Sequence, residues 1–472
     1  MTKDTNPKNR PEEQAEDLNT FSFKQSQPSA KVDSQKNSLF LHHKYFLLMF
    51  IIIIGIGIFT SKYYQVFKKE SIDLANPTGM QPTPTLHIEP SVIYNPPLEL
   101  SLAHNEFGFD IFHKLINTKD DTQNIFISPS SIALALSMVY NGADNKTKDA
   151  MTQTLHFSKM DLEKINTSGS ELIKHLTSLN PDIEVSIANS IWMREEITFN
   201  PQFLETNKKY YEAQVQAIDF SSPNAANIIN SWVSTNTRSK IPSIVSSPID
   251  KDVVMYLINA IYFKGIWTYE FDTKLTKEKS FTLPDLTKIN HPSMTQERKD
   301  YFYLENDDFQ GIYLPYGKEK NLGMYVFLPK DNISQLENKL SLDNWNNWVN
   351  NFKEKEGTLI LPKFKIEYDK ELTDTLSSLG MGIAFSDNAD FSKMRSENDI
   401  KISKVKHKTY INLDEKGTEA TAVTSVEMVF TTSLPNEKDT FYMEVNKPFF
   451  FAITDRESKE ILFMGVVNNP QE

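Results

Sequence analysis

The chain has 472 residues, a formal net charge of -12 and no cysteine. The lack of cysteine excludes disulfide frameworks, thiol nucleophiles and cysteine-ligated zinc. The acidic balance, without a long lysine or arginine block, gives no reason to expect a nucleic-acid partner. Hydrophobic residues make up 39% of the chain, which is enough for a large folded core.

The first 98 residues divide into three segments that precede the folded part. Residues 1–38 are polar, contain prolines and carry charges of both signs, as a disordered tail does. Residues 39–61 include the apolar run YFLLMFIIIIGIGIFT, bordered by Lys44 and Lys62, and predict a transmembrane helix or signal anchor. A cleaved signal peptide is the alternative, but its polar leader is long for one. Residues 62–98 are rich in proline and predict an extended spacer.

A membrane anchor at residues 39–61 determines where we expect the protein to act. We expect a membrane-anchored protein whose folded domain is extracellular, or a secreted protein if the segment is cleaved. Lysines are balanced on the two sides of the segment, so the positive-inside rule does not set its orientation.

Residues 99–472 contain no repeat and no second linker, and predict one large domain. Apolar residues recur at helical spacing over 102–116, which predicts a helix. A second apolar helix is predicted within 128–143, and it opens on Ser128 and Pro129.

The later part of the domain is rich in predicted strands. Short runs of β-branched and aromatic residues, bounded by turn residues, lie at 253–267, 321–329, 357–368, 446–454 and 460–467. Helical patterns first and strand patterns later favour an α+β fold over alternating βαβ units.

No motif of an enzyme active site occurs in the chain. There is no G-x-S-x-G elbow, no H-E-x-x-H and no P-loop, and a Gly-x-Gly lies inside the apolar run. His407 lies in a strand-like run and is more simply a hydrogen-bonded core histidine than a catalytic one. Trp267 is expected to pack in the core. The sequence therefore predicts a protein that is not an enzyme and needs no metal or cofactor.

The segment DEKGTEATAVTS, residues 414–425, has the pattern of a strand with a very small buried side. Its alternate positions are small or apolar on one side, Thr418, Ala420, Ala422, Thr424, Val426 and Met428, whereas the other side contains Glu419, Ser425 and Glu427. A permanent central strand would carry larger residues, so this segment can enter or leave a sheet at low cost. Gly417 supplies the permissive backbone for such a movement. An exposed, alanine-rich loop is the alternative.

These residues resemble the serpin family of serine protease inhibitors. The stretch LDEKGTEATAVTS resembles the hinge of a serpin reactive-centre loop. Further motifs match in family order at 124–143, 230–241, 259–267, 361–381, 388–394 and 446–470. The resemblance covers residues 99–472 and leaves out the tail, the apolar segment and the spacer.

The resemblance implies a serpin fold with three β-sheets, about nine helices and an exposed reactive-centre loop at about 415–440. It implies a suicide inhibitor, in which a serine protease attacks the loop, an acyl-enzyme forms, and the cut loop enters the main sheet with the protease attached. The protease is then a covalent partner of a monomeric inhibitor. The alternative is a non-inhibitory serpin that acts as a binding or chaperone protein. Its usual mark is a bulky or charged residue at Thr418, Ala420 or Ala422, and none is present.

Family spacing from Gly417 places the reactive bond between Thr431 and Thr432. No lysine or arginine occurs from Gly417 to Glu437, which argues against a trypsin-like target. The side chains near the bond suit an elastase-like protease first, and a chymotrypsin-like or subtilisin-like protease second.

The resemblance also assigns roles to residues outside the bond. Glu415 corresponds to the glutamate at the loop base, Lys363 to its lysine partner, and Trp267 to the tryptophan under the upper end of the main sheet. The polar cluster that opens when the loop inserts comprises Ser128, Ser131, Asn259 and His407. The hinge comprises Glu415, Gly417, Thr418, Glu419, Ala420, Thr421, Ala422, Val423 and Thr424.

Overall fold

A computed structural model of the chain describes residues 97–118, 122–178, 182–418 and 439–471. The chain divides into two units, residues 1–91 and 92–472, and every described residue lies in the second. The predicted tail, apolar segment and nearly all of the spacer therefore lie outside the described residues. No helix within the described ranges is long and apolar enough to span a bilayer.

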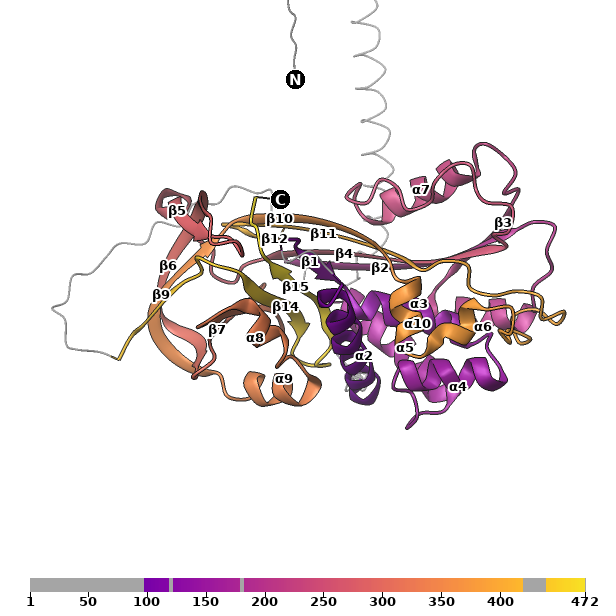
Figure 1. Cartoon of the computed structure of the whole chain (residues 1–472), viewed down its shortest axis with the longest axis horizontal. Coiled ribbons are helices and arrows are strands. Elements are labelled where there is room, and N and C mark those ends of the chain that lie inside the picture. The colour runs from indigo at the N-terminus through magenta and orange to yellow at the C-terminus, as the bar shows by residue number, and fades with distance from the viewer. Residues whose placement is uncertain (1–96, 119–121, 179–181, 419–438, 472) are drawn as a thin grey trace, which may run out of the picture. The chain divides into compact units, whose positions relative to one another are not determined.

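Nine α-helices lie in the described residues, most of them in the first half of the domain (Figure 1). They are α2 (Leu98–Ile116), α3 (Pro129–Tyr140), α4 (Asn145–Thr154), α5 (Leu162–Thr177), α6 (Pro201–Tyr211), α7 (Ala225–Asn236), α8 (Ile333–Glu337), α9 (Leu342–Val349) and α10 (Thr373–Ser378). The residues at its N-terminus determine where α3 begins. The Ser128 hydroxyl accepts a hydrogen bond from the Ser131 N–H, and Pro129 occupies the first turn.

A six-stranded sheet extends across the molecule with helices on both faces (Figure 1). Its strands, in spatial order, are β10 (Phe364–Glu371), β11 (Lys406–Asp414), β12 (Gly417–Thr418), β4 (Met255–Ile266), β2 (Ile183–Arg194) and β3 (Gln214–Ile218). Helix α7 covers one face, whereas α3 and α5 lie against the other. Trp192, Ile229 and Val233 bury a small core under α7, separate from the main core on the opposite face.

The remaining described strands form a nine-stranded sheet. Its spatial order is β1 (Ile125–Ile127), β15 (Ile461–Val467), β14 (Phe449–Asp455), β8 (Leu322–Pro329), β7 (Phe309–Pro315), β6 (Lys288–Glu305), β9 (Lys353–Pro362) and β13 (Phe441–Glu444), and β5 (Lys277–Thr282) pairs with β6. The family resemblance implied three sheets, whereas the described residues form two, because strands of two expected sheets are hydrogen-bonded into this nine-stranded sheet. The 18-residue β6 causes this, because its start pairs with β5, its end with β7, and most of its length with β9.

The predicted α+β architecture is confirmed, and most predicted elements are present. The helices at 102–116 and 128–143 correspond to α2 and α3. The predicted strands correspond to β4, β8, β14 and β15, and the run at 357–368 divides into β9 and β10 at Lys363. The expected order of helices first and strands later was too simple, because β1, β2 and β3 lie among the early helices. The buried polar residues Asn189 and Ser190 interrupt the apolar alternation of β2 and hide it in the sequence.

Candidate functional site

The two-residue strand β12 lies between β4 and β11 in the six-stranded sheet. Thr418 stands opposite Gly265 on one side and Leu413 on the other, and it pairs antiparallel with both strands. Residues 419–438 follow and lie outside the description. Within the described ranges, β12 is the only strand that pairs with the facing edges of β4 and β11. Strand β12 therefore occupies the first two residue positions of a strand between β4 and β11.

Gly417 is required by the close approach of β12 to β4. Its φ is +147°, a backbone conformation that residues with side chains rarely adopt. A Cβ atom at this position would lie 2.0 Å from the carbonyl oxygen of Gly265 and 3.0 Å from the Cα of Ile266. Both are backbone atoms and cannot rotate away, so only glycine fits here.

An aromatic pair lies under the start of β12 and holds it in the sheet. Trp267 stacks on Tyr316 with the ring centroids 4.3 Å apart. The Tyr316 hydroxyl hydrogen-bonds the buried hydroxyl of Thr418 at 2.7 Å. Trp267 also donates from its indole nitrogen to the carbonyl of Asp414 at 3.0 Å and from its backbone N–H to the carbonyl of Lys416 at 2.8 Å. The structure thus places Trp267 under the end of the sheet where the loop begins.

The base of the loop is fixed by a charged pair. Lys363 donates from Nζ to the Glu415 carboxylate at 2.9 Å, and Thr276 donates from its hydroxyl at 2.8 Å. Burial acts to raise the pKa of Glu415, but the hydrogen bonds from Lys363 and Thr276 outweigh burial and hold this pKa below its ordinary value. Glu415 is therefore an anion at neutral pH, and it pairs with the predicted lysine.

The four residues of the predicted polar cluster meet at the N-terminus of α3. His407 accepts a hydrogen bond at Nε2 from the backbone N–H of Ser128 at 3.1 Å. Ser131 donates from its hydroxyl to the side-chain oxygen of Asn259, and Asn259 donates to the side-chain oxygen of Asn189 at 2.7 Å. His407 belongs to β11 and Asn259 to β4, so α3 bonds both sides of the sheet position that β12 begins.

His407 is held as a neutral imidazole. Burial lowers the pKa of His407 from 6.5 to about 4. Because Nε2 accepts from a backbone N–H, its proton must be on Nδ1. Protonation of Nε2 would remove this acceptor and leave the Ser128 N–H facing a cation. His407 therefore acts as a structural hydrogen-bond acceptor and not as a proton shuttle.

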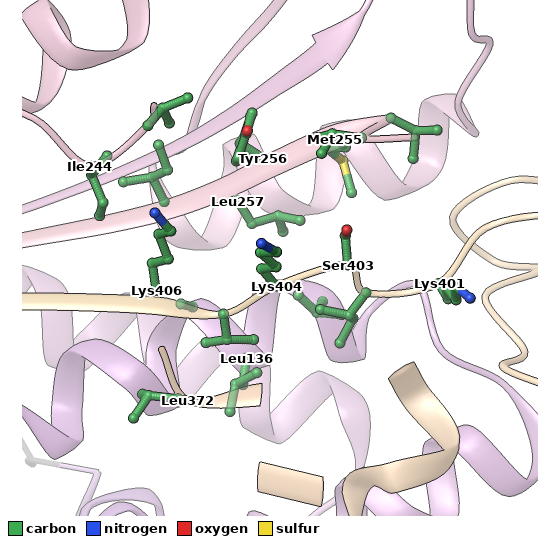
Figure 2. A pocket seen from close by; sticks show the side chains of 18 of the residues that line it. Leu136, Ile244, Met255, Tyr256, Leu257, Leu372, Lys401, Ser403, Lys404 and Lys406 are labelled. Carbon is green, nitrogen blue, oxygen red and sulfur yellow. The ribbon is translucent and has the colours of Figure 1, made fainter. Parts of the chain in front are cut away.

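A cavity of about 350 Å³ lies beside the polar cluster, between β4 and residues 401–407 (Figure 2). Leu136 of α3 and Leu257 of β4 are among its apolar lining residues. Lys404 and Lys406 extend from the 401–407 segment toward β4. The cavity lies on the line that β12 would follow if it continued between β4 and β11.

Several predicted functional residues lie outside the described ranges. These are the hinge residues Glu419, Ala420, Thr421, Ala422, Val423 and Thr424, and the reactive-bond residues Thr431 and Thr432. Conversely, sequence reasoning missed Thr276, Tyr316 and Asn189, because their roles depend on partners distant in the chain.

A buried set of serine, histidine and aspartate lies elsewhere and does not have the geometry of a hydrolase triad. His175 Nε2 lies 2.8 Å from Asp455 Oδ2, and the Ser458 hydroxyl donates to the same oxygen at 2.6 Å. In a triad the serine donates to the histidine. Here both groups bond the carboxylate, and all three residues are buried. The three residues form a buried hydrogen-bond network next to β14 and β15.

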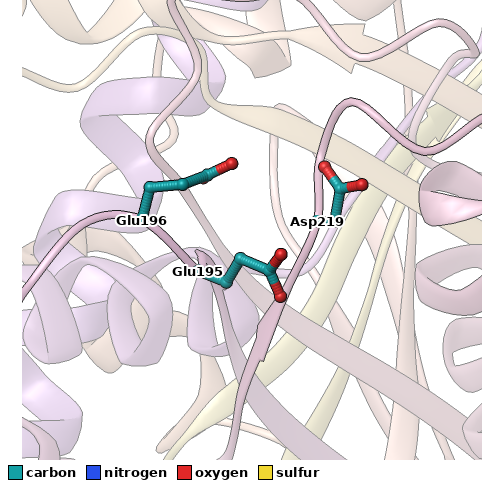
Figure 3. Close-up of side chains that lie close together, drawn as sticks. All are labelled: Glu195, Glu196 and Asp219. Atoms are coloured by element: carbon teal, nitrogen blue, oxygen red, sulfur yellow. The ribbon is translucent and has the colours of Figure 1, made fainter.

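Three carboxylates gather at the surface near the end of β2 (Figure 3). Glu195, Glu196 and Asp219 each offer an oxygen within 4.8 Å of the others. Both glutamates are exposed, and Asp219 already accepts hydrogen bonds from the Ser221 hydroxyl and N–H. Exposed acidic groups often gather without a metal ion, so we assign no metal site here.

The neutral state of His407 predicts a specific pH dependence of stability. In the folded chain the His407 imidazole stays neutral down to about pH 4, whereas in the unfolded chain it binds a proton near pH 6.5. Stability from this group is complete above pH 6.5 and falls as pH drops toward 4. Urea unfolding measures the free energy of unfolding at pH 7 and at pH 5. This free energy should fall by about 2 kcal/mol more in wild type than in His407→Gln, which keeps a hydrogen-bond acceptor but does not titrate. Equal losses in the two proteins would contradict the assignment.

The contact of Gly417 with Gly265 predicts that Gly417→Ala is destabilising. The added methyl group must displace β12 from β4 or strain the backbone, at a cost of about 1–3 kcal/mol in urea unfolding. Gly382→Ala is the matched control, because a Cβ there would meet only the Ser377 carbonyl oxygen, at 3.8 Å. A Gly417→Ala protein as stable as the control would refute the close approach.

Comparison with known proteins agrees with this geometry. The family model for serpin (serine protease inhibitor) matches residues 102–470. An uncharacterised serpin-like protein of Methanosarcina mazei is 34% identical over 385 residues, which cover 79% of this chain and 88% of that protein. Leukocyte elastase inhibitor of Xenopus laevis is 35% identical over 385 residues, which cover 79% of this chain and 99% of that protein.

Solved structures show the same fold. Human thyroxine-binding globulin in complex with thyroxine matches with a TM-score of 0.72 and 29% identity, over 80% of this chain and 100% of that one. The matched range of the family model includes β12, the Glu415 pair and the polar cluster. The chain therefore belongs to the serpin family.

Proposed function

We propose that the protein is a suicide inhibitor of serine proteases. The protease serine attacks the Thr431–Thr432 bond, the bond breaks to form an acyl-enzyme at Thr431, and the new N-terminus departs at Thr432. The loop N-terminal to the cut then continues β12 between β4 and β11. The acylated protease moves with the loop before water can release it.

The observation that carries this proposal is the position of β12. Gly417 and Thr418 already occupy the first two places of a strand between β4 and β11. Each residue that follows would add ladder hydrogen bonds, worth about 0.5–1.5 kcal/mol net per bond. About a dozen residues at roughly 3.3 Å each would carry the linked protease about 40 Å.

The residues that follow β12 suit this movement. Thr418 faces the core, so a continuing strand would turn Ala420, Ala422 and Thr424 to the same side. None of them is bulky or charged, so few neighbours need to move. A non-inhibitory serpin would more often carry an obstructing residue at one of these positions.

Loop composition supports an elastase-like target, followed by chymotrypsin-like and subtilisin-like proteases. The loop has no lysine or arginine between Gly417 and Glu437, so it offers no cation to a trypsin-like pocket. The related Xenopus laevis protein bears the name leukocyte elastase inhibitor, in line with this choice.

The alternative is a non-inhibitory serpin that binds a ligand or another protein. The similar fold of thyroxine-binding globulin in complex with thyroxine supports this alternative, because a shared fold does not fix function. Loop cleavage without protease capture distinguishes the two functions.

We also propose, from the sequence alone, that residues 39–61 anchor the inhibitor in a membrane with its serpin domain outside the cell. The apolar run and its lysine borders support the anchor, and the proline-rich residues 62–98 would hold the domain away from the bilayer. In this arrangement the inhibitor protects the cell surface from secreted proteases.

Incubation with elastase or chymotrypsin should trap the protease covalently. Denaturing gels should show an adduct that survives boiling, and intact-mass analysis should show a released peptide that begins at Thr432. Thr418→Arg places a large cation on the buried side of β12, so this variant should be cleaved but form little adduct. Thr418→Ser is the matched control and should retain inhibition.

Two results would contradict this function. Cleavage of the wild-type loop by every serine protease tried, with no adduct, would favour the non-inhibitory alternative. Efficient trapping of trypsin alone would overturn the predicted target class.

Protease treatment of intact cells tests the outward orientation. An external protease should cut the proline-rich spacer at residues 62–98 and release the serpin domain into the medium, whereas a cytoplasmic marker stays intact. A serpin domain that remains cell-associated until lysis would contradict outward display.

A further inference from the structure

We propose that Lys240 is a positioning residue, which holds β11 to the β4 side of the six-stranded sheet through the ring of Tyr410. The contact would control how readily β11 parts from β4. It belongs to the folded chain itself, whereas its role in protease capture rests on the proposed function. Lys240 follows α7, so the contact lies on the face of the sheet opposite α3 and the polar cluster (Figure 1).

Tyr410 lies where backbone pairing does not join β11 to the β4 side. In the described ranges, β12 pairs with β11 only at Leu413 and Asp414. Three residues earlier in β11, Tyr410 pairs with Glu367 of β10 on one edge and with no described strand on the other. At Tyr410, β11 is therefore held to the β4 side by side-chain contacts.

The Tyr410 ring faces α7 and not the main core. Buried and half-buried residues alternate along β11, and the buried set includes Thr409 and Ile411. Successive side chains of a strand point to opposite faces of the sheet. The half-buried Tyr410 therefore lies on the face that α7 covers.

Lys240 is fixed to the β4 side of the sheet by the residues around it. Its Nζ lies 4.8 Å from the centroid of the Tyr410 ring. Two residues earlier, Arg238 donates from Nε and Nη2 to the Glu184 carboxylate of β2, at 2.9 and 2.5 Å. On the other side of Lys240, Ile241 is buried in the small core under α7. Lys240 thus extends from a base on β2 and α7 to a ring on β11.

The turn that places Lys240 has an unfavourable backbone conformation. Arg238 has a φ of +51° and Ser239 a φ of +64°, in the left-handed region that residues with side chains seldom adopt. Hydrogen bonds from the Ser239 N–H to the Ser234 carbonyl and from the Lys240 N–H to the Thr237 carbonyl hold the turn, at 2.7 and 2.9 Å. Strained backbone of this kind is concentrated at functional positions. This conformation supports a role for Lys240 beyond that of a solvated surface lysine.

A second lysine contacts the same ring but does not cross the sheet. Lys365 Nζ lies 5.5 Å from the centroid of the Tyr410 ring. Lys365 belongs to β10, which pairs with β11 along its whole length. Lys365 would therefore move together with Tyr410, whereas Lys240 would stay with α7. The two contacts have the same chemistry, and they differ in whether they join the two sides of the sheet.

The N–H of Ser128 reports movement of β11. It donates to His407, which belongs to β11 like Tyr410. A movement that takes Tyr410 away from Lys240 would also break the bond from Ser128 to His407. The exchange rate of this N–H with solvent deuterium then measures how often β11 parts from its neighbours.

Hydrogen–deuterium exchange of the full-length, uncut chain tests the proposal. Lys240→Met keeps the length of the side chain but removes its charge, and it should speed exchange at Ser128 about twofold to fivefold, the contribution of one partly exposed cation–π contact. Lys240→Arg keeps a cation over the ring and should exchange like wild type. Lys365→Met is the matched control and should also exchange like wild type.

The amides of β14, in the main core, separate local opening from a loss of overall stability, and their exchange should not change in any variant. Unchanged exchange at Ser128 in Lys240→Met, or an equal increase in Lys365→Met, would overturn the inference. An equal increase at Ser128 and in β14 would overturn it too, because Lys240 would then only stabilise the whole fold.

Protease capture gives a second readout. If β11 parts sooner from β4, the amount of free cut chain released per adduct with elastase should fall about twofold to fivefold in Lys240→Met. An unchanged amount would contradict the role of Lys240 in capture. Faster exchange in Lys240→Met, together with a wild-type chain that forms no adduct with any serine protease, would contradict the proposed function alone.

Discussion

The structure around the candidate site depends on the hydrogen bonds that the N-terminus of α3 makes to both sides of the sheet. The Ser128 N–H donates to His407 on β11, and the Ser131 hydroxyl donates to Asn259 on β4. Both partners are buried or half-buried, so losing either bond would leave a polar group without its partner in a dry setting. These bonds hold the strands at a set separation through the helix.

The upper end of the same sheet is held by different forces. Trp267 and Tyr316 form an apolar stack under Thr418, and Glu415 is held by Lys363 and Thr276. Gly417 then passes so close to Gly265 that a side chain has no space. Packing, charge and backbone contact therefore all help to fix Gly417 and Thr418 in the sheet.

Sequence reasoning reached part of this site. Glu415 and Lys363 were paired by family resemblance, and His407 was expected to be a hydrogen-bonded core histidine. Both are found as such. Strand β2 was missed, because Asn189 and Ser190 look like turn residues in the sequence. Asn189 bonds Tyr211 and Asn259 on other elements, and Ser190 accepts from Trp192 within β2.

The placement of α7 has a mechanical consequence for the sheet if the loop inserts as proposed. Helix α7 packs on β2 and β4, on one side of β12, whereas β10 and β11 lie on the other side as a continuous ladder. The sheet thus consists of two blocks, each with its own backbone hydrogen bonds. They are joined by β12 at one end and, beyond it, by α3 and by the stacking of Lys240 over Tyr410. In the proposed mechanism, widening would separate the two blocks at these side-chain contacts and would keep the backbone hydrogen bonds within each block.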